Sequence, residues 1–353
     1  MSQRRFLTLL AVALTALALA LLLTGRHHRV RDTQGSLLLP ALAADLNGVS
    51  AVTIRKGGAK PAVSLRRTAT DWTVAERDDY PADVLKLRRL LLTLSEARLT
   101  EEKTSNPSSY ALIGVEDPGK PGANGAEISI VAAHGTTRLI VGKPSGDGNF
   151  VRFAADTASY LAEPGISFET EPRYWIDSRL FDLPVATIQS LAVQPADGPA
   201  YALHRVSAEG DAFALDSVPA GRSAADAKTL APSPTALGNL AADDVAAASS
   251  IDFSKPSTIV VALADGDSIT LTGSGVGDKR WITVASTKNA ALDAKSKGRA
   301  YAIPRYRFDA IFRPLENLLQ SKPAASKPAA ASTGAAASSK AAVPRPARTP
   351  PTH

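Results

Sequence analysis

The sequence of 353 residues contains no cysteine and only five histidines. A chain without cysteine forms no disulfide, no thiolate metal site and no lipid-modified cysteine anchor. The histidines do not form an H-E-x-x-H or similar ligand pair, and two of them, His27 and His28, are adjacent near the N-terminus. We therefore predict no metal site.

Complete catalytic motifs are also lacking. Gly142-Lys143 has the wrong upstream spacing for a phosphate-binding loop, and Pro144 follows where Ser or Thr would bind magnesium. The glycines of residues 273–277 lie between predicted strands rather than before a helix, which excludes a dinucleotide fingerprint. Asp265-Gly266-Asp267 has no distal Glu for a calcium loop, and Ser145 has no nucleophile-elbow motif. We predict that the protein is not an enzyme, with no catalytic, cofactor-binding or metal-binding residues.

Acidic residues are missing from both ends of the chain. Residues 1–31 and 321–353 together hold ten Lys and Arg and no Asp or Glu. Removing these ten charges from the net +6 leaves residues 32–320 at −4. The positive charge is therefore a property of the ends, and the central part has no basic footprint for phosphate binding. We predict no nucleic-acid partner.

One long apolar run is present, from Phe6 to Leu23, and Arg4 and Arg5 precede it. About 18 residues at about 1.5 Å each reach about 27 Å, which is enough to cross the hydrocarbon core of a bilayer. Ala18-Leu19-Ala20 resembles a signal-peptide cleavage site, but three leucines follow it where a polar region belongs. We predict a retained transmembrane anchor with basic flanks over residues 1–31, and cleavage of this segment is the alternative.

After a membrane-proximal lead over residues 32–48, alternating apolar residues predict a first unit of antiparallel strands over residues 49–163. The predicted strands cover residues 49–54, 62–66, 71–74, 127–132, 137–141, 150–153 and 159–162. Turn residues predict a loop over residues 100–125.

One amphipathic helix is predicted within this unit. Tyr80-Pro81-Ala82-Asp83 supplies a helix start, and leucines then recur at helical spacing up to about Ala97. Lys86, Arg88 and Arg89 lie on the side opposite the leucines. We interpret them as a solvated helix face, and a docking patch is the alternative.

The second half of the chain resembles the first. Residues 61–67 match residues 199–205 in their pattern, and residues 127–153 align without gaps to residues 258–284. This self-similarity predicts a duplication, in which each unit contains antiparallel β-meanders and an intervening helix. Chance similarity between β-hairpins is the alternative.

The second unit is predicted over residues 185–320, after a connector over residues 164–184. Its helix is placed in the Ala-rich residues 235–248, and an amphipathic segment over residues 308–319 closes the unit. Residues 321–353 consist mainly of Ala, Ser, Pro and Lys. Such a composition buries too little apolar surface to offset its ordering entropy, so we predict a disordered tail.

Aromatic residues make up only 5% of the chain, and three of them are tryptophans. Trp72, Trp175 and Trp281 each lie beside apolar neighbours in a predicted strand or connector. Large rings in such positions usually belong to the core. Stacking against a carbohydrate in a groove is the alternative.

These features have a parallel in a known family. They are the anchor, the Val-x-x-Val-x-Ile strand at residues 49–54, Trp72 followed by Tyr80-Pro81-Ala82-Asp83, the Val141-Gly142-Lys143 hairpin and the Tyr174-Trp175-Ile176 connector. Over about residues 45–315 the chain resembles the DUF4340 family of membrane-anchored bacterial proteins. The resemblance implies an unknown biochemical function, no assigned catalytic residues, genes often beside gliding-motility-type ABC-transporter genes, and an N-in, C-out orientation.

The sequence and the resemblance together predict an α+β protein with a single membrane pass in the bacterial inner membrane and most of its chain extracytoplasmic. We expect an accessory or scaffold subunit of an ABC-type transport complex, with the permease and ATPase as partners. The alternative is a module that binds a cell-envelope glycan or lipid in a groove between the two units, and an enzyme comes third. The sequence leaves the oligomeric state and any ligand open.

Overall fold

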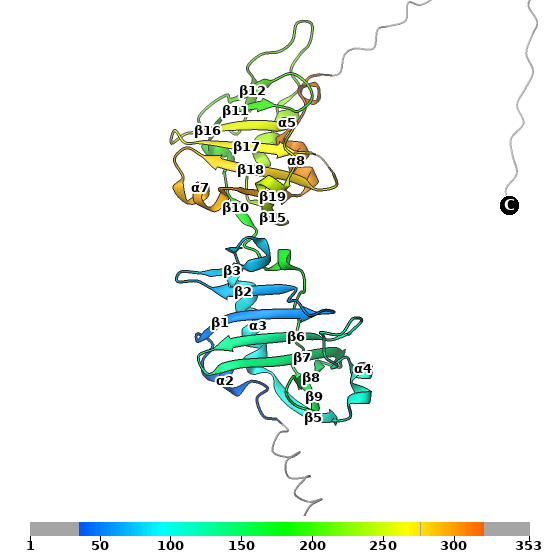
Figure 1. Ribbon diagram of the computed structural model, residues 1–353. Helices are drawn as coiled ribbons and strands as arrows, with labels where there is room; N and C mark the ends of the chain where they lie inside the picture. Colours follow the sequence, from blue (N-terminus) through cyan, green and yellow to red (C-terminus); the bar gives the residue numbers. More distant parts are fainter. Residues whose placement is uncertain (1–34, 276, 321–353) are drawn as a thin grey trace, which may run out of the picture.

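The computed structural model describes residues 35–275 and 277–320. The predicted anchor of residues 1–31 and the predicted tail of residues 321–353 lie outside the described residues. Among the residues that are described, no helix is long and apolar enough to cross a membrane. The described chain is a mixed α+β structure of mainly antiparallel sheets with few helices (Figure 1), as predicted.

The first sheet has nine strands in the order β4-β3-β2-β1-β6-β7-β8-β9-β5, and all neighbours are antiparallel. The strands are β1 (Val49–Lys56), β2 (Val63–Arg67), β3 (Trp72–Val74), β4 (Tyr80–Pro81), β5 (Arg98–Thr104), β6 (Ala126–Ala132), β7 (Gly135–Ser145), β8 (Gly148–Phe153) and β9 (Ser159–Glu163). The helices of this unit are α2 (Pro40–Ala44), α3 (Val84–Glu96) and α4 (Tyr110–Ile113).

The second sheet has eight strands in the order β13-β12-β11-β16-β17-β18-β19-β15. The strands are β11 (Ile188–Gln194), β12 (Tyr201–Arg205), β13 (Phe213–Leu215), β15 (Asp244–Ala247), β16 (Ser257–Leu263), β17 (Ser268–Ser274), β18 (Arg280–Ser286) and β19 (Arg299–Ile303). The helices are α5 (Ala227–Leu230), α6 (Pro232–Thr235), α7 (Ala290–Ser296) and α8 (Arg305–Ile311). A two-stranded sheet pairs β10 (Arg179–Phe181) with β14 (Leu240–Ala241).

The second sheet repeats the strand order of the first, because every strand of the first sheet except the short edge strand β4 has a counterpart at the same place in the second. The paired positions repeat too: Ile128 lies opposite Leu139, and Ile259 lies opposite Leu271. The β16–β17 hairpin is one residue longer than the β6–β7 hairpin. The predicted gap-free alignment of residues 127–153 with 258–284 is therefore wrong by one residue in its middle part.

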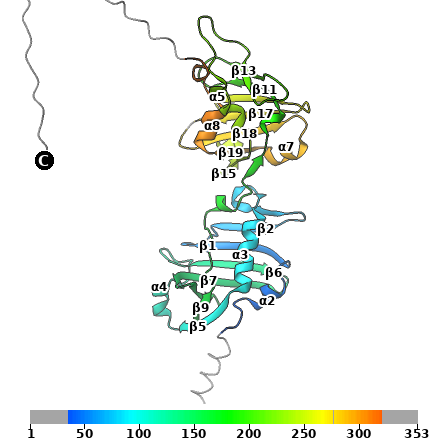
Figure 2. The same cartoon turned by 180° about the vertical axis from the view of Figure 1, so that it is seen from behind.

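Each sheet buries one face under helices. In β1, Val52 and Ile54 are fully buried while Thr53 between them is only half-buried, as the alternation of side chains along a strand requires. Helix α3 lies across the buried face of the first sheet (Figure 2). In the second unit, Phe308 of α8 packs on the corresponding face of β17. The core is therefore a layer between each sheet and its helices.

The predicted loop over residues 100–125 is wrong in its first part, because residues 98–104 form β5. This strand lies at the end of the sheet and pairs only with β9 over most of its length. Its side chains at Glu101 and Lys103 are polar, so the strand has no apolar alternation to reveal it. The same predicted loop also contains α4.

The predicted helix over residues 235–248 is also wrong. These residues form β14, β15 and a 3-10 turn, and α6 ends where that helix was expected to begin. Alanine has a high intrinsic helix propensity, but pairing with a neighbouring strand overrides it here. Val245 lies opposite the buried Tyr301 of β19, which fixes these residues in the sheet.

Candidate interaction surface

The acidic motif at residues 265–267 is a structural turn. The buried Asp267 carboxylate accepts hydrogen bonds from the backbone amides of Ser268, Thr287 and Lys288 and from the hydroxyls of Ser286 and Thr287. Burial acts to raise the pKa of Asp267, but these bonds outweigh it and hold the pKa well below its usual range. The carboxylate therefore ties the β16–β17 hairpin to the end of β18.

The Gly142-Lys143 pair is also structural. A Cβ on Gly142 would lie 2.4 Å from the carbonyl oxygen of Ile113, so only glycine lets β7 pass the end of α4. Lys143 Nζ donates a hydrogen bond to the carbonyl oxygen of Leu112 at 2.9 Å. Within residues 35–275 and 277–320, no group of three or more His, Cys, Asp or Glu side chains is placed to hold a metal ion.

The three tryptophans differ in their surroundings. Trp175 is 1% exposed and donates its Nε1 hydrogen to the carbonyl oxygen of Glu169 at 2.9 Å, so it belongs to the core. Trp72 is half-buried and packs against the core beside α3. Trp281 is half-buried, with Lys279 Nζ 5.4 Å from its ring centroid. The glycan alternative needed Trp175 or Trp281 to be exposed, and Trp175 does not meet that condition.

Helix α3 follows Asp83, whose carboxylate accepts hydrogen bonds from the backbone N–H groups of Leu85 and Lys86 at 3.1 Å each. This is the usual bonding of a helix N-cap. Pro81, which the sequence placed near the start of the helix, belongs to β4 and pairs with Thr73 of β3. The strand therefore runs closer to the helix than the sequence predicted, and Asp83 fixes where α3 starts.

The outer side of α3 is apolar and cationic rather than simply polar. Leu85 is 74% exposed, Val84 42% and Leu92 39%. Arg88 and Arg89 are exposed between them, and neither guanidinium group forms a hydrogen bond or ion pair within the described part of the chain. We call these five residues the α3 ridge.

Lys86 has a different role from the two arginines. Its Nζ donates to the carbonyl oxygen of Tyr174 at 2.6 Å, lies 3.4 Å from the Asp83 carboxylate and stands 4.5 Å from the centre of the Tyr174 ring. Lys86 therefore ties α3 to the connector. Of the three cations that the sequence placed on the polar side of the helix, the structure leaves Arg88 and Arg89 without a partner in the described residues.

A groove of about 460 Å³ runs beside the α3 ridge, and we call it the α3 groove. It lies between α3, the start of β1 and the turn from β2 to β3. Its walls include Leu46, Trp72, Leu87 and Leu91, and Arg67 and Arg88 lie at its rim. Val84 and Leu92 belong to both the ridge and the groove, so the two form one continuous surface.

A larger cavity of about 720 Å³ lies where the connector meets the second unit. Leu180, Leu183, Ile269 and Leu292 give it an apolar lining. The charged groups around it are already engaged; Lys295 Nζ, for example, donates to an Asp177 carboxylate oxygen at 2.8 Å. The cavity therefore offers space and apolar contact, and the described residues that line it include no charged group without a partner.

The two units meet edge to edge through polar contacts. Arg77 Nε donates to one carboxylate oxygen of Asp244 at 2.6 Å, and Lys279 Nζ donates to the other at 2.9 Å. Arg299 donates to the backbone carbonyl oxygen of Asp78 at 3.2 Å. Burial acts to raise the pKa of Asp244, but the hydrogen bonds from Arg77 and Lys279 outweigh it and lower the pKa.

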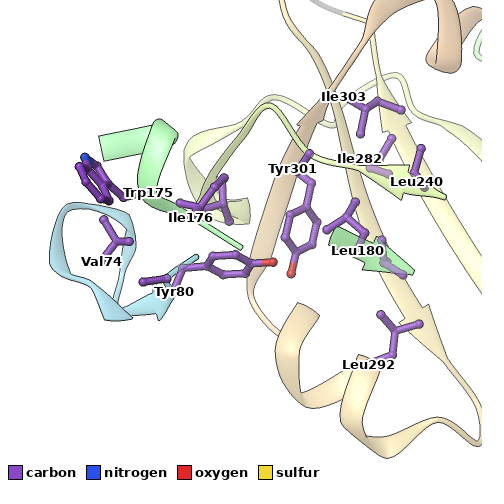
Figure 3. Close-up of a cluster of buried hydrophobic side chains, with 14 of the residues drawn as sticks. Val74, Tyr80, Trp175, Ile176, Leu180, Leu240, Ile282, Leu292, Tyr301 and Ile303 are labelled. Carbon is purple, nitrogen blue, oxygen red and sulfur yellow. The ribbon is translucent and has the colours of Figure 1, made fainter. Parts of the chain in front are cut away.

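Two tyrosines fill the centre of this junction. Tyr80 and Tyr301 are both fully buried and meet edge to face, with ring centroids 5.9 Å apart (Figure 3). The Tyr301 hydroxyl donates to the carbonyl oxygen of Lys295 at 3.0 Å, whereas the Tyr80 hydroxyl has no hydrogen-bond partner among the described residues. Burial raises the pKa of both hydroxyls. The rings join the two sheets through a packed contact.

The fold and these surfaces define a two-unit β-sheet protein with an exposed apolar and cationic helix face. The chain belongs to the DUF4340 family, described as a domain of unknown function, whose family model matches residues 72–258. The matched segment begins at Trp72 in β3, contains α3, and ends in β16, so it is narrower than the residues 45–315 over which the sequence resembles the family. It includes Arg77, Tyr80 and Asp244 of the junction, whereas Lys279, Arg299 and Tyr301 lie beyond it. No curated protein and no solved structure matches the chain.

Proposed function

We propose that this protein is a non-enzymatic accessory or scaffold subunit of an ABC-type transport complex. In this proposal, the Phe6–Leu23 segment holds it in the bacterial inner membrane with a single pass. The two repeated sheet units then lie outside the cytoplasm, followed by a disordered tail. The family resemblance motivates the transporter partner.

The observation that carries the proposal is the α3 ridge with its groove. Exposed apolar side chains that are contiguous and rimmed by charge are typical of protein interaction sites. This surface stands on a helix that packs along the buried face of the first sheet through Leu87, Leu90 and Leu94. The junction contacts join that sheet to the second. The surface is therefore fixed to both packed sheets of the protein, which suits a subunit that binds and positions partners.

Co-purification tests the proposal. The tagged full-length protein is extracted from its native membrane in mild detergent, and retained proteins are quantified by mass spectrometry. A tagged single-pass protein of unrelated sequence serves as the control. We expect an ABC permease and its ATPase to be retained in comparable amounts and to be absent from the control. Recovery of the protein alone, or with wall polymer only, would reject the transporter role.

Binding of an envelope glycan or lipid is the second candidate, and the cavity beside the connector favours it. Its size lies within the range of small-molecule sites, about 300–1,000 Å³. The burial of Trp175 weighs against a stacked sugar. Titration of the full-length protein with lipid extract and with solubilised wall glycan distinguishes the two candidates, since an accessory subunit needs neither ligand to retain its transporter.

A further inference from the structure

We infer that the α3 ridge and groove bind an acidic amphipathic helix of a partner protein. This surface is the one that carries the proposed function, and the inference says which kind of partner segment it binds. The identity of the complex rests on the proposed function. Its physical basis is the apolar content, the charge and the shape of this one surface.

Apolar side chains gather here more than elsewhere. Among the described residues, nine large apolar side chains are exposed, and Val84, Leu85 and Leu92 of the α3 ridge are three of them. A fourth, Tyr174, lies against Lys86 at the start of the same helix. Burying such side chains against a partner is favourable by about 25 cal/mol per Å² of apolar surface.

The charge of the surface selects an acidic partner. Arg88 and Arg89 project from the ridge without a partner in the described chain, and Arg67 stands at the rim of the groove, where it donates to the carbonyl oxygen of Asn47. The carboxylate in the groove, Asp71, already accepts the backbone N–H of Trp72 at 2.8 Å. Guanidinium groups pair best with carboxylates, often through two hydrogen bonds, so the complementary segment carries Asp or Glu.

The shape favours a protein helix over a lipid surface. Insertion into a bilayer requires apolar side chains that project from the protein, whereas Trp72 and Leu46 line a hollow. A hollow beside a ridge receives the apolar stripe of an incoming helix, with anchors at i, i+3, i+4 and i+7. Helix α3 has 13 residues, which at about 1.5 Å per residue gives a contact about 20 Å long.

Designed peptides test the inference with the full-length protein in nanodiscs of neutral phosphatidylcholine. The first probe is a fluorescent amphipathic helix of about 18 residues with Leu on one face and Glu on the other, long enough to be helical once bound. The second has Lys in place of every Glu. The third probe is a vesicle of anionic phosphatidylglycerol. Empty nanodiscs give the background for fluorescence anisotropy and for vesicle flotation.

One double variant and one single variant probe the surface, each with a matched control. Arg88→Glu with Arg89→Glu reverses the charge, and Lys228→Glu with Lys255→Glu makes the same change at two exposed lysines elsewhere. Leu85→Ser removes an exposed leucine of the ridge. Its control is Leu112→Ser in α4, because Leu112 is 73% exposed against 74% for Leu85. All of these side chains are exposed, so the variants are expected to fold.

We expect the acidic helix to bind at least about tenfold more tightly than the basic one. The arginine reversal should invert that preference, and Leu85→Ser should weaken binding about tenfold or less, with both controls unchanged. Equal binding of both peptides, no binding, or binding insensitive to the ridge variants would refute the inference. Leu85-dependent flotation with anionic vesicles would refute it in favour of a lipid surface.

The outcome is separable from that of the proposed function. If the transporter co-purifies equally well with the Arg88→Glu, Arg89→Glu variant, the accessory role stands and the α3 surface is not the contact. If the ridge selects the acidic helix but no transporter is retained by the unaltered protein, the surface chemistry stands and the transporter role fails.

Discussion

The Arg77–Asp244 ion pair is expected to hold the two units together. The two side chains are 21% and 9% exposed, and Lys279 adds a second cation to the same carboxylate. Breaking a buried ion pair costs about 3–5 kcal/mol, and a hydrogen bond to a charged group contributes about 1.5–3 kcal/mol. Because Arg77 retains contact with solvent, we expect a coupling free energy of about 1–3 kcal/mol between the two side chains at neutral pH.

A double-mutant cycle measures this coupling. The unaltered protein, Arg77→Ala, Asp244→Ala and the double variant are each unfolded with urea in detergent. Tryptophan fluorescence follows the unfolding, and its dependence on urea gives the free energy of unfolding. The same cycle on Arg222 and Glu316 is the control. The nitrogen–oxygen distance in this control pair is 3.0 Å, against 2.6 Å for Arg77 and Asp244. Because Glu316 is 69% exposed, we expect a coupling below about 0.5 kcal/mol there.

The coupling has a defined pH dependence. The pKa of Asp244 is lower in the folded chain than its ordinary value of 3.8, so the folded state favours the ionised form. The stabilisation is therefore complete above the ordinary pKa and is lost as the pH falls through the lowered one. Coupling should persist at neutral pH and shrink in acid below the ordinary pKa. A junction coupling as small as that of the control pair, or one that grows in acid, would refute this account of the junction.

Substitutions at three further places, the tyrosine pair, Gly273 and Asp83, test the packing by urea unfolding. Tyr80→Phe removes a buried hydroxyl without a partner among the described residues and should change the free energy of unfolding by less than about 0.5 kcal/mol. Tyr301→Phe removes a hydrogen bond and should lower the free energy of unfolding by about 0.5–1.5 kcal/mol. Equal losses in the two variants would contradict this expectation. Gly273→Ala places a Cβ 2.6 Å from the Phe312 ring and should cost about 1–3 kcal/mol; a neutral result would show that the ring moves freely. Asp83→Ala removes the N-cap of α3 and should cost about 0.5–2 kcal/mol, with Asp83→Asn retaining most of it.

The sequence was most informative where apolar residues alternate. The predicted strand over residues 49–54 lies within β1, and those over residues 127–132 and 137–141 lie within β6 and β7. Tyr160 and Tyr301 occupy corresponding positions in the two sheets, opposite Val151 in β8 and Ile282 in β18. Because one face of each sheet is buried, apolar and polar residues alternate along its strands, and this alternation predicts the strands from the sequence.

The edge strands and the junction could not be predicted in the same way. β5 has a polar pattern, and β15 has an Ala-rich one, since each has a sheet neighbour on one side and contributes few large apolar residues. Arg77 and Asp244 are 167 residues apart, and nothing in the local sequence of either indicates the other. The sequence showed Lys86, Arg88 and Arg89 as three cations on one side of a helix. Only the structure separates the engaged Lys86 from the two arginines, which have no partner among the described residues.

The repeat shows why the outer edges of the two sheets, within the described residues, carry no copy of the Arg77–Asp244 ion pair. In corresponding registers, Asp244 of β15 is matched by Glu101 of β5, which is exposed and paired with Lys103. On the other side, Leu215 corresponds to Val74, so the position matching Arg77 is Val218, an exposed apolar residue. Among the described residues, the outer edges β5 and β13 therefore lack the ion pair that the inner edges form. A head-to-tail array needs the same contact at every step, and these outer edges do not provide that contact for a further unit.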